Sequence, residues 1–311
     1  MSNIIIYLGS KCNLNCKYCH RENEQDIILS KYFLKELSSF NGNIIFRGGE
    51  PTLYMDTIKK IVSNSKKAQF SITTNGIELN KHINYFKEHN FHISISYDGN
   101  DIRQFDPYTN YINYPSQNLS NTIVLTRNMD IFNTLDVFDE KSIIIGKRIL
   151  LVPHIGHYTN KENKEYAMLE EDYEKISSQL KKCMNIFVYE RKKYHTTNNR
   201  YYGIYTFFNN YYRNNFSFGE TVCANHKSSR VDLSGQRYNC LYIRDQKLGN
   251  EWLQTQQSII REISPKCERC DVYDMCGAGC LKSLYHNKEC KFYKDIFTWY
   301  KKFYKENINF L

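Results

Sequence analysis

The stretch NIIIYLGSKCNLNCKYCH, residues 3–20, joins a short apolar run to a loop that carries three cysteines. The run from Ile4 to Leu8 has the length and β-branched composition of a buried strand. The cysteines follow directly, at Cys12, Cys16 and Cys19. Three thiolates on one short loop can hold three irons of a 4Fe-4S cube and leave the fourth iron open. A structural zinc site that includes His20 is the alternative, although adjacent Cys19 and His20 suit one tetrahedron poorly.

Similar β-branched runs recur through the first half of the chain. They predict six strands, at 4–7, 44–46, 70–73, 93–96, 123–126 and 149–152. Segments with helical spacing lie between most of them, as at 29–40, 57–65 and 80–89. The alternation predicts an α/β fold with parallel strands, a partial (β/α)6 TIM-type barrel. Polar, Gly or Pro residues follow each strand, so we expect the functional groups at the carboxyl ends of the strands.

Composition excludes several classes of protein. Of the 311 residues 41% are hydrophobic, which excludes a disordered or fibrous chain. The net charge of +9 accompanies Lys, Asn, Ile and Tyr enrichment throughout, so nucleic acid is not an expected partner. No signal peptide precedes the eleven cysteines, and no apolar run approaches the roughly 18 residues of a spanning helix. We expect reduced thiols, a cytoplasmic location and no membrane contact.

A second motif, Gly48-Gly49-Glu50-Pro51, follows the second predicted strand. Its glycines let the backbone approach a ligand closely, and Glu50 offers an acceptor to an ammonium group. With the cysteine loop, this motif resembles the radical S-adenosylmethionine (SAM) superfamily, whose members carry C-x3-C-x2-C after strand one and a GGEP-type motif after strand two. The resemblance implies that the open iron binds SAM and that its cleavage yields a 5′-deoxyadenosyl radical.

The same resemblance implies further contacts with SAM. The three cysteines are the catalytic cluster ligands, Tyr18 packs beside the adenine, and the turn of Gly48, Gly49, Glu50 and Pro51 holds the methionyl amine. Ser96 and Arg127 contact the ribose or carboxylate, unless they are solvated strand ends. Thr74 and Asn75, which follow the third predicted strand, are expected at the same site.

Seven more cysteines lie between residues 223 and 290, at spacings that resemble the SPASM extension of many radical SAM enzymes. The resemblance implies two auxiliary 4Fe-4S clusters, and therefore three in all. Cluster I would be held by Cys223, Cys240 and Cys280, and cluster II by Cys267, Cys270, Cys276 and Cys290. A zinc ribbon accounts for residues 267–280 but leaves the remaining cysteines without a role. Residues 230–241 predict a hairpin around Gly235. We place the barrel at 1–210 and the SPASM domain, with this hairpin and short helices, at 211–311.

Cys183 stands outside both patterns, on a helix predicted over 169–189. It can be a buried structural thiol, a fourth ligand of cluster I, or a hydrogen-atom donor near the substrate.

SPASM-bearing relatives mostly modify peptides or proteins. The resemblance therefore implies an oxidoreductase that installs a thioether or carbon–carbon crosslink in a ribosomally synthesised peptide. A sulfatase-maturase-like oxidase is the second interpretation, although Leu241 stands where those enzymes usually have Asp. A peptide epimerase that uses Cys183, and an iron–sulfur electron carrier without SAM cleavage, are further alternatives.

The expected partners follow from this function. They are a peptide or protein substrate and a reductant such as flavodoxin or ferredoxin. Because the first strand starts at Asn3, leaving no room for a leader-binding domain, we expect a separate leader-binding protein or recognition by the aromatic segments 101–120 and 194–218.

Overall fold

The structure is a computed structural model. It describes residues 3–19, 27–99, 103, 105–109, 119–155, 165–196, 199–222, 228–240, 243–247, 252–280 and 286–311. The chain forms two compact units, one of Met1–Ser120 and Cys223–Trp252, the other of Asn121–Val222 and Leu253–Leu311. Among the described residues, no helix combines the length and apolarity needed to cross a membrane.

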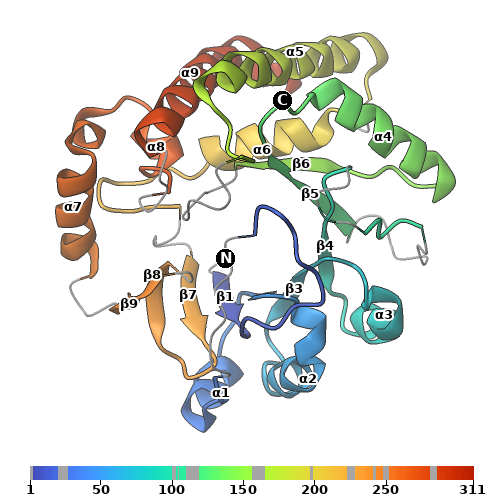
Figure 1. The fold of residues 1–311 in the computed structure, drawn as a ribbon, viewed down its shortest axis with the longest axis vertical. Coiled ribbons are helices and arrows are strands. Elements are labelled where there is room, and N and C mark those ends of the chain that lie inside the picture. The colour runs from blue at the N-terminus through green and yellow to red at the C-terminus, as the bar shows by residue number, and fades with distance from the viewer. Residues whose placement is uncertain are drawn as a thin grey trace. The chain divides into compact units, whose positions relative to one another are not determined.

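The first unit is built on a mostly parallel sheet (Figure 1). Its central strand, β1 (Asn3–Tyr7), runs parallel to both of its neighbours, β2 (Asn43–Arg47) and β7 (Ser228–Asp232). Beyond β2 the parallel order continues with β3 (Gln69–Thr74) and β4 (His92–Ser96). Beyond β7 lie two antiparallel strands, β8 (Arg237–Cys240) and β9 (Ile243–Lys247). Since Tyr7 pairs with Arg47, the carboxyl ends of β1 and β2 lie side by side.

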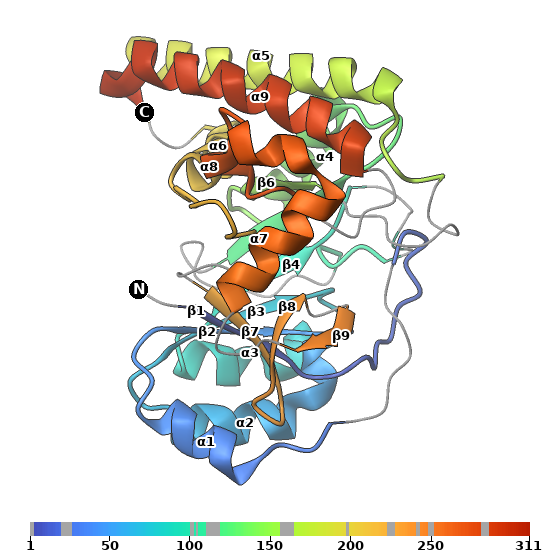
Figure 2. The ribbon, with the colours of Figure 1, turned by 90° about the vertical axis from the view of Figure 1, so that its left-hand side faces the viewer.

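Helices of the first unit follow its strands and cover one face of the sheet (Figure 2). They are α1 (Lys31–Ser38), α2 (Met55–Asn64) and α3 (Leu79–Glu88), with a short 3-10 helix, η1 (Pro51–Tyr54), before α2. Buried and less buried residues alternate along β3 and β4, so alternate side chains enter the core beneath these helices. Phe70 and Phe91 stack there with ring centroids 5.4 Å apart.

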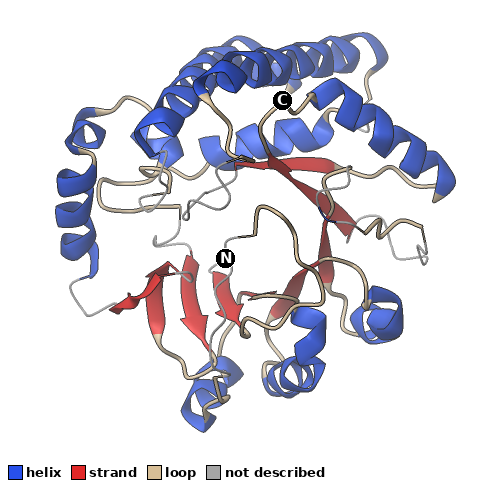
Figure 3. Cartoon of the chain, viewed as in Figure 1, coloured by secondary structure: helices blue, strands red, loops and turns tan. Residues whose placement is uncertain are grey.

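The second unit is mainly helical (Figure 3). Two parallel strands, β5 (Leu119–Leu125) and β6 (Leu151–Ile155), pair Asn121 with Leu151. The helices are α4 (Ile131–Ile144), α5 (Glu170–Tyr194), α6 (Tyr202–Tyr212), α7 (Trp252–Ile263), α8 (Tyr273–Cys276) and α9 (His286–Asn307), with two 3-10 helices, η4 (Pro265–Arg269) and η5 (Ile308–Phe310). The long helices α5 and α9 run side by side (Figure 2). Phe208 of α6 stacks on Tyr300 of α9, with ring centroids 4.8 Å apart.

The predicted α/β class with parallel strands is confirmed. A strand is present at each of the six predicted positions, although β6 begins at Leu151 rather than residue 149. The predicted hairpin is also present as β7 and β8, and its turn contains Gly235 at φ +89°. β7 to β9 extend the sheet of β1, although their sequence lies in the segment assigned to the SPASM domain. The division near residue 210 stays a prediction.

Candidate active site

The loop after β1 and the turn after β2 pack backbone to backbone. The Gly49 N–H donates to the Gly9 carbonyl at 2.8 Å, and the Glu50 N–H donates to the Lys11 carbonyl at 2.7 Å. A Cβ added at Gly49 would lie 2.2 Å from the Lys11 carbonyl oxygen, and one at Gly48 would lie 2.6 Å from the Gly9 carbonyl oxygen. Glycine is therefore required at both positions, and the two sequence motifs are in direct contact.

Cys12, Cys16 and Cys19 lie on this loop and form no disulfide with any described cysteine. Burial raises the pKa of Cys16, the other two cysteines raise it further, and the Arg103 guanidinium opposes the shift. N–H donors point at two of the sulfurs. Leu14 N lies 3.5 Å from Cys12 Sγ, and Arg103 Nη1 lies 3.9 Å from Cys16 Sγ. Thiol ligands with N–H donors around them suit an iron–sulfur cluster, whose sulfurs accept such hydrogen bonds.

Glu50 ties the turn to the end of β3. Its side chain is 1% exposed. Oε1 accepts from the Thr52 N–H at 3.0 Å, from the Thr52 hydroxyl at 2.7 Å and from the Thr74 hydroxyl at 2.7 Å. Oε2 accepts from the Asn75 N–H at 2.7 Å. Burial raises the pKa of Glu50, and these donors oppose that shift. The carboxylate is thus bonded within the protein on both oxygens.

Asn75 connects this network to the cysteine loop. Its side-chain amide donates to Asn13 Oδ1 at 2.8 Å and lies 4.0 Å from Cys12 Sγ. Residues after β1, β2 and β3 therefore meet at one edge of the sheet, as the parallel order predicts. Thr74 and Asn75 lie where the sequence expects a cofactor site.

Tyr18 belongs to a buried polar cluster. Its hydroxyl donates to Asp98 Oδ2 at 2.5 Å, and Arg103 Nε donates to the same oxygen at 2.6 Å. The Arg103 guanidinium lies over the Tyr18 ring, 5.3 Å from its centroid. Burial and the Asp98 charge raise the pKa of Tyr18 well above its usual range. The expected contact between Tyr18 and adenine stays a prediction; the observed neighbours of Tyr18 are Asp98 and Arg103.

Asp98 and Arg103 are site residues that the motif analysis missed. Asp98 follows β4 at the same edge as the other loops, which was a usable signal. The sequence does not indicate a role for Arg103, which lies five residues after Asp98. Only the structure shows that its side chain approaches Cys16.

The other two predicted SAM contacts have different surroundings. Ser96 is half-buried at the end of β4. Arg127, in the second unit, forms an ion pair with Glu171 at 3.0 Å, and its backbone N–H donates to Tyr166. Its buried Nε has no hydrogen-bond partner among the residues that the structure describes. Their roles toward SAM remain predictions.

Four of the cysteines assigned to the SPASM extension line one small cavity of the second unit. These are the four predicted to share cluster II: Cys267, Cys270, Cys276 and Cys290. Burial raises the pKa of Cys276 well above its usual range, and the other three cysteines raise it further. Gly277 has φ +55°, and a Cβ there would lie 2.6 Å from the Phe216 ring, so glycine is needed for the tight turn. A 4Fe-4S cube takes four thiolate ligands, so cluster II at these four cysteines stays a prediction.

The predicted ligands of cluster I are only partly described. Cys280 is half-buried in the second unit. Cys240 ends β8, but its side chain lies outside the described part of the chain, as does Cys223 altogether.

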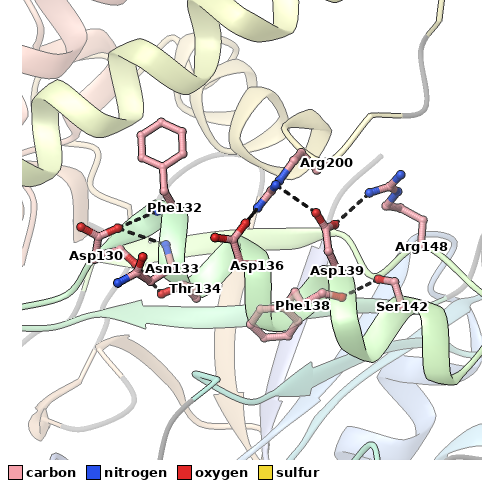
Figure 4. Close-up of polar contacts among 10 residues, drawn as sticks. All are labelled: Asp130, Phe132, Asn133, Thr134, Asp136, Phe138, Asp139, Ser142, Arg148 and Arg200. Carbon is pink, nitrogen blue, oxygen red and sulfur yellow. Dashed lines mark hydrogen bonds and ion pairs between the residues drawn. The ribbon is translucent and has the colours of Figure 1, made fainter.

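Cys183 is fully buried on α5. Burial raises the pKa of Cys183 to about 12, and Arg200 opposes the shift. Arg200 is itself fixed by α4, where it pairs with Asp136 at 2.6 Å and with Asp139 at 3.1 Å (Figure 4). A neutral thiol enclosed among side chains favours the structural interpretation over a cluster ligand or hydrogen-atom donor.

Three comparisons relate the chain to known proteins. An uncharacterized protein of Methanocaldococcus jannaschii is 32% identical over 124 residues, which are 35% of this chain and 43% of that protein. A cysteine-type anaerobic sulfatase-maturating enzyme of Clostridium novyi is 32% identical over 124 residues, or 32% of this chain and 33% of that enzyme. The chain thus spans less than half the length of both.

Among solved structures, SuiB of Streptococcus suis, bound to its precursor peptide SuiA, has a similar fold. The TM-score is 0.55 at 16% sequence identity, over 92% of this chain and 72% of SuiB. Residues 6–139 match the model of the radical SAM superfamily, and this range contains the cysteine loop, the Gly48 to Pro51 turn and the Asp98–Arg103 pair. This match identifies a radical SAM domain within residues 6–139 of the chain.

Proposed function

We propose that the chain is a radical SAM oxidoreductase that modifies a peptide or protein. The observation that carries this proposal is the packing of the Cys12 loop against the Gly48 to Pro51 turn. This packing brings the three thiols beside a turn whose close backbone contacts require glycine. Thr74 and Asn75, at the end of β3, are bonded to the same turn through Glu50.

Each part of this site has a distinct role in the proposal. Cys12, Cys16 and Cys19 hold three irons of a 4Fe-4S cluster and leave the fourth for SAM. A cluster held there would supply the electron for reductive cleavage of SAM, the chemistry that lets the enzyme remove hydrogen from a substrate. Gly48 and Gly49 admit the methionyl group close to the backbone, and Glu50 keeps the turn in place through Thr74 and Asn75. Ser96 and Arg127 are proposed contacts of the ribose or carboxylate.

Two auxiliary clusters complete the proposal. Support for cluster II comes from the cavity shared by its four cysteines. Cluster I, at Cys223, Cys240 and Cys280, rests on sequence spacing alone. If these clusters take the electron of the substrate radical, the net reaction is an oxidation. Anchoring the substrate is their alternative role.

The substrate class is proposed from the relatives. SuiB shares the fold and was solved with a precursor peptide, which supports a peptide substrate. The crosslink itself is proposed from the resemblance to SPASM-bearing enzymes. The sulfatase-maturating relative supports side-chain oxidation as the second candidate. Burial of Cys183 weighs against an epimerase that uses this thiol. A separate leader-binding protein and a flavodoxin or ferredoxin remain proposed partners.

Reconstitution tests the proposal. Protein reconstituted anaerobically with iron and sulfide, reduced with dithionite and given SAM should release 5′-deoxyadenosine and contain about twelve irons per chain. Cys16→Ala should abolish release. Cys267→Ala should retain it while losing about four irons. An electron carrier would release none in any variant, and equal release from Cys16→Ala and the unaltered protein would refute the assignment.

A further inference from the structure

A buried ion pair lies beside the cysteine loop. The side chains of Asp98 and Arg103 are 0% and 12% exposed, and they are joined at 2.6 Å. Arg103 directs its Nη1 at Cys16 Sγ, 3.9 Å away. Three neighbours thus fix one guanidinium: the Asp98 carboxylate, the Tyr18 ring and the Cys16 sulfur.

The Asp98–Arg103 pair is better explained by an electrostatic effect on the neighbouring thiol than by a contribution to the stability of the fold. A buried ion pair contributes little net stability, because desolvation offsets the attraction between the charges. A guanidinium keeps its positive charge at every relevant pH, and its planar fork can bond two groups at once. Here one side of the fork meets Asp98 and the other meets a thiol expected to ligate iron.

A positive charge and an N–H donor at a ligand sulfur favour the reduced form of a cluster, which carries one more negative charge. Asp98 has the opposite effect, because its negative charge lies in the same buried cluster. The two side chains therefore act on the cluster with opposite signs.

We propose that Arg103 is a positioning residue that raises the reduction potential of the cluster held by Cys12, Cys16 and Cys19, with Asp98 as its counterion. This proposal rests on the proposed function, because it requires a cluster on this loop. It assigns Arg103 a role in electron uptake rather than in contact with SAM.

Potentiometric titration followed by electron paramagnetic resonance tests this inference on the reconstituted full chain. The signal that disappears in Cys16→Ala identifies the cluster. Arg103→Gln should reduce the ratio of reduced to oxidised cluster at a fixed potential about tenfold, a shift of about 59 mV for one electron. Asp98→Asn, which keeps an acceptor for Tyr18 and Arg103, should shift the ratio the other way. The double variant, with neither charge, should lie between the two.

Arg237→Gln is the matched control, since it also breaks an ion pair of the first unit, with Glu36. It should leave the potential unchanged. Shifts of the same sign in Arg103→Gln and Asp98→Asn, or no shift in either, overturn the proposal, because general loosening of the loop would move both alike. If Arg103→Gln does not fold, Asp98→Asn and the double variant decide by the same signs.

The two proposals fail in different ways. A cluster that is present and cleaves SAM, but whose potential ignores both charges, refutes only the role of Arg103. If Cys16→Ala removes no signal, the proposed function fails and this inference fails with it.

Discussion

Glu50 offers the sharpest test of how the site is held together. Its carboxylate accepts four hydrogen bonds and is 1% exposed. Glu50→Ala leaves all four donors without this acceptor. At about 1 kcal/mol for each bond, the free energy of unfolding should fall by about 4 kcal/mol. Glu50→Gln keeps the shape but turns an amide N–H toward one donor, which should cost about 1–3 kcal/mol.

Urea denaturation of the cluster-free, reduced protein measures these changes without any contribution from SAM or iron. Glu36→Gln is the matched control, because Glu36 is 46% exposed and pairs with Arg237 at the surface. Its effect should stay within about 1 kcal/mol. A parallel measurement of SAM binding to the reconstituted variants separates the two possible roles of Glu50.

If Glu50→Ala unfolds at the urea concentration of the unaltered protein yet no longer binds SAM, then Glu50 serves the methionyl amine and does not hold the turn. If instead stability falls as expected, weaker SAM binding follows from a displaced turn.

Two more predictions follow from buried positions. Gly49→Ala places a methyl group 2.2 Å from the Lys11 carbonyl oxygen, which should displace the cysteine loop. Iron analysis of the reconstituted protein should then find about four fewer irons per chain. Unchanged iron content would refute the close packing of the two loops. The pKa of Cys183 is raised to about 12 in the folded protein, from the usual thiol value of 9.0. As pH rises, the thiol is therefore deprotonated in the unfolded state at a lower pH than in the folded state. The free energy of unfolding should then fall as pH rises above 9.0. Between pH 8 and 10 the loss should be about 1.4 kcal/mol greater in the unaltered protein than in Cys183→Ala, and equal slopes would contradict the burial of this thiol.

The sequence predicts the first unit well because its pattern is local. Each β-branched run lies within one strand, and consecutive parallel strands place their following loops at one edge. The contact between the Cys12 loop and the Gly48 turn follows from that rule. Neither the burial of Glu50 nor its four donors could be predicted, because all four donors depend on how Thr52, Thr74 and Asn75 close around it.

Other features were missed for physical reasons. The pairing of β7 with β1 joins segments more than 200 residues apart, and no local pattern encodes such a partner. Helix α4 was not predicted because apolar residues occur on its exposed side, where Ile143 and Ile144 are 80% and 71% exposed. A helix without a clean apolar face has little periodicity to detect.

The surroundings of Cys12, Cys16 and Cys19 depend both on the cysteine motif and on the fold. The motif supplies three thiols and one backbone donor, the Leu14 N–H, but the side-chain donors near the sulfurs come from segments after other strands, which the motif does not contain. Asn75, after β3, approaches Cys12, whereas Arg103, beyond β4, approaches Cys16. The neutral amide of Asn75 therefore lies near Cys12, and the cationic guanidinium of Arg103 lies near Cys16. The order of the strands determines which of these side chains lies near which sulfur. Two chains with the same cysteine spacing can thus hold the same cluster in different fields, because the residues that set the field lie 60 to 90 positions away along the chain.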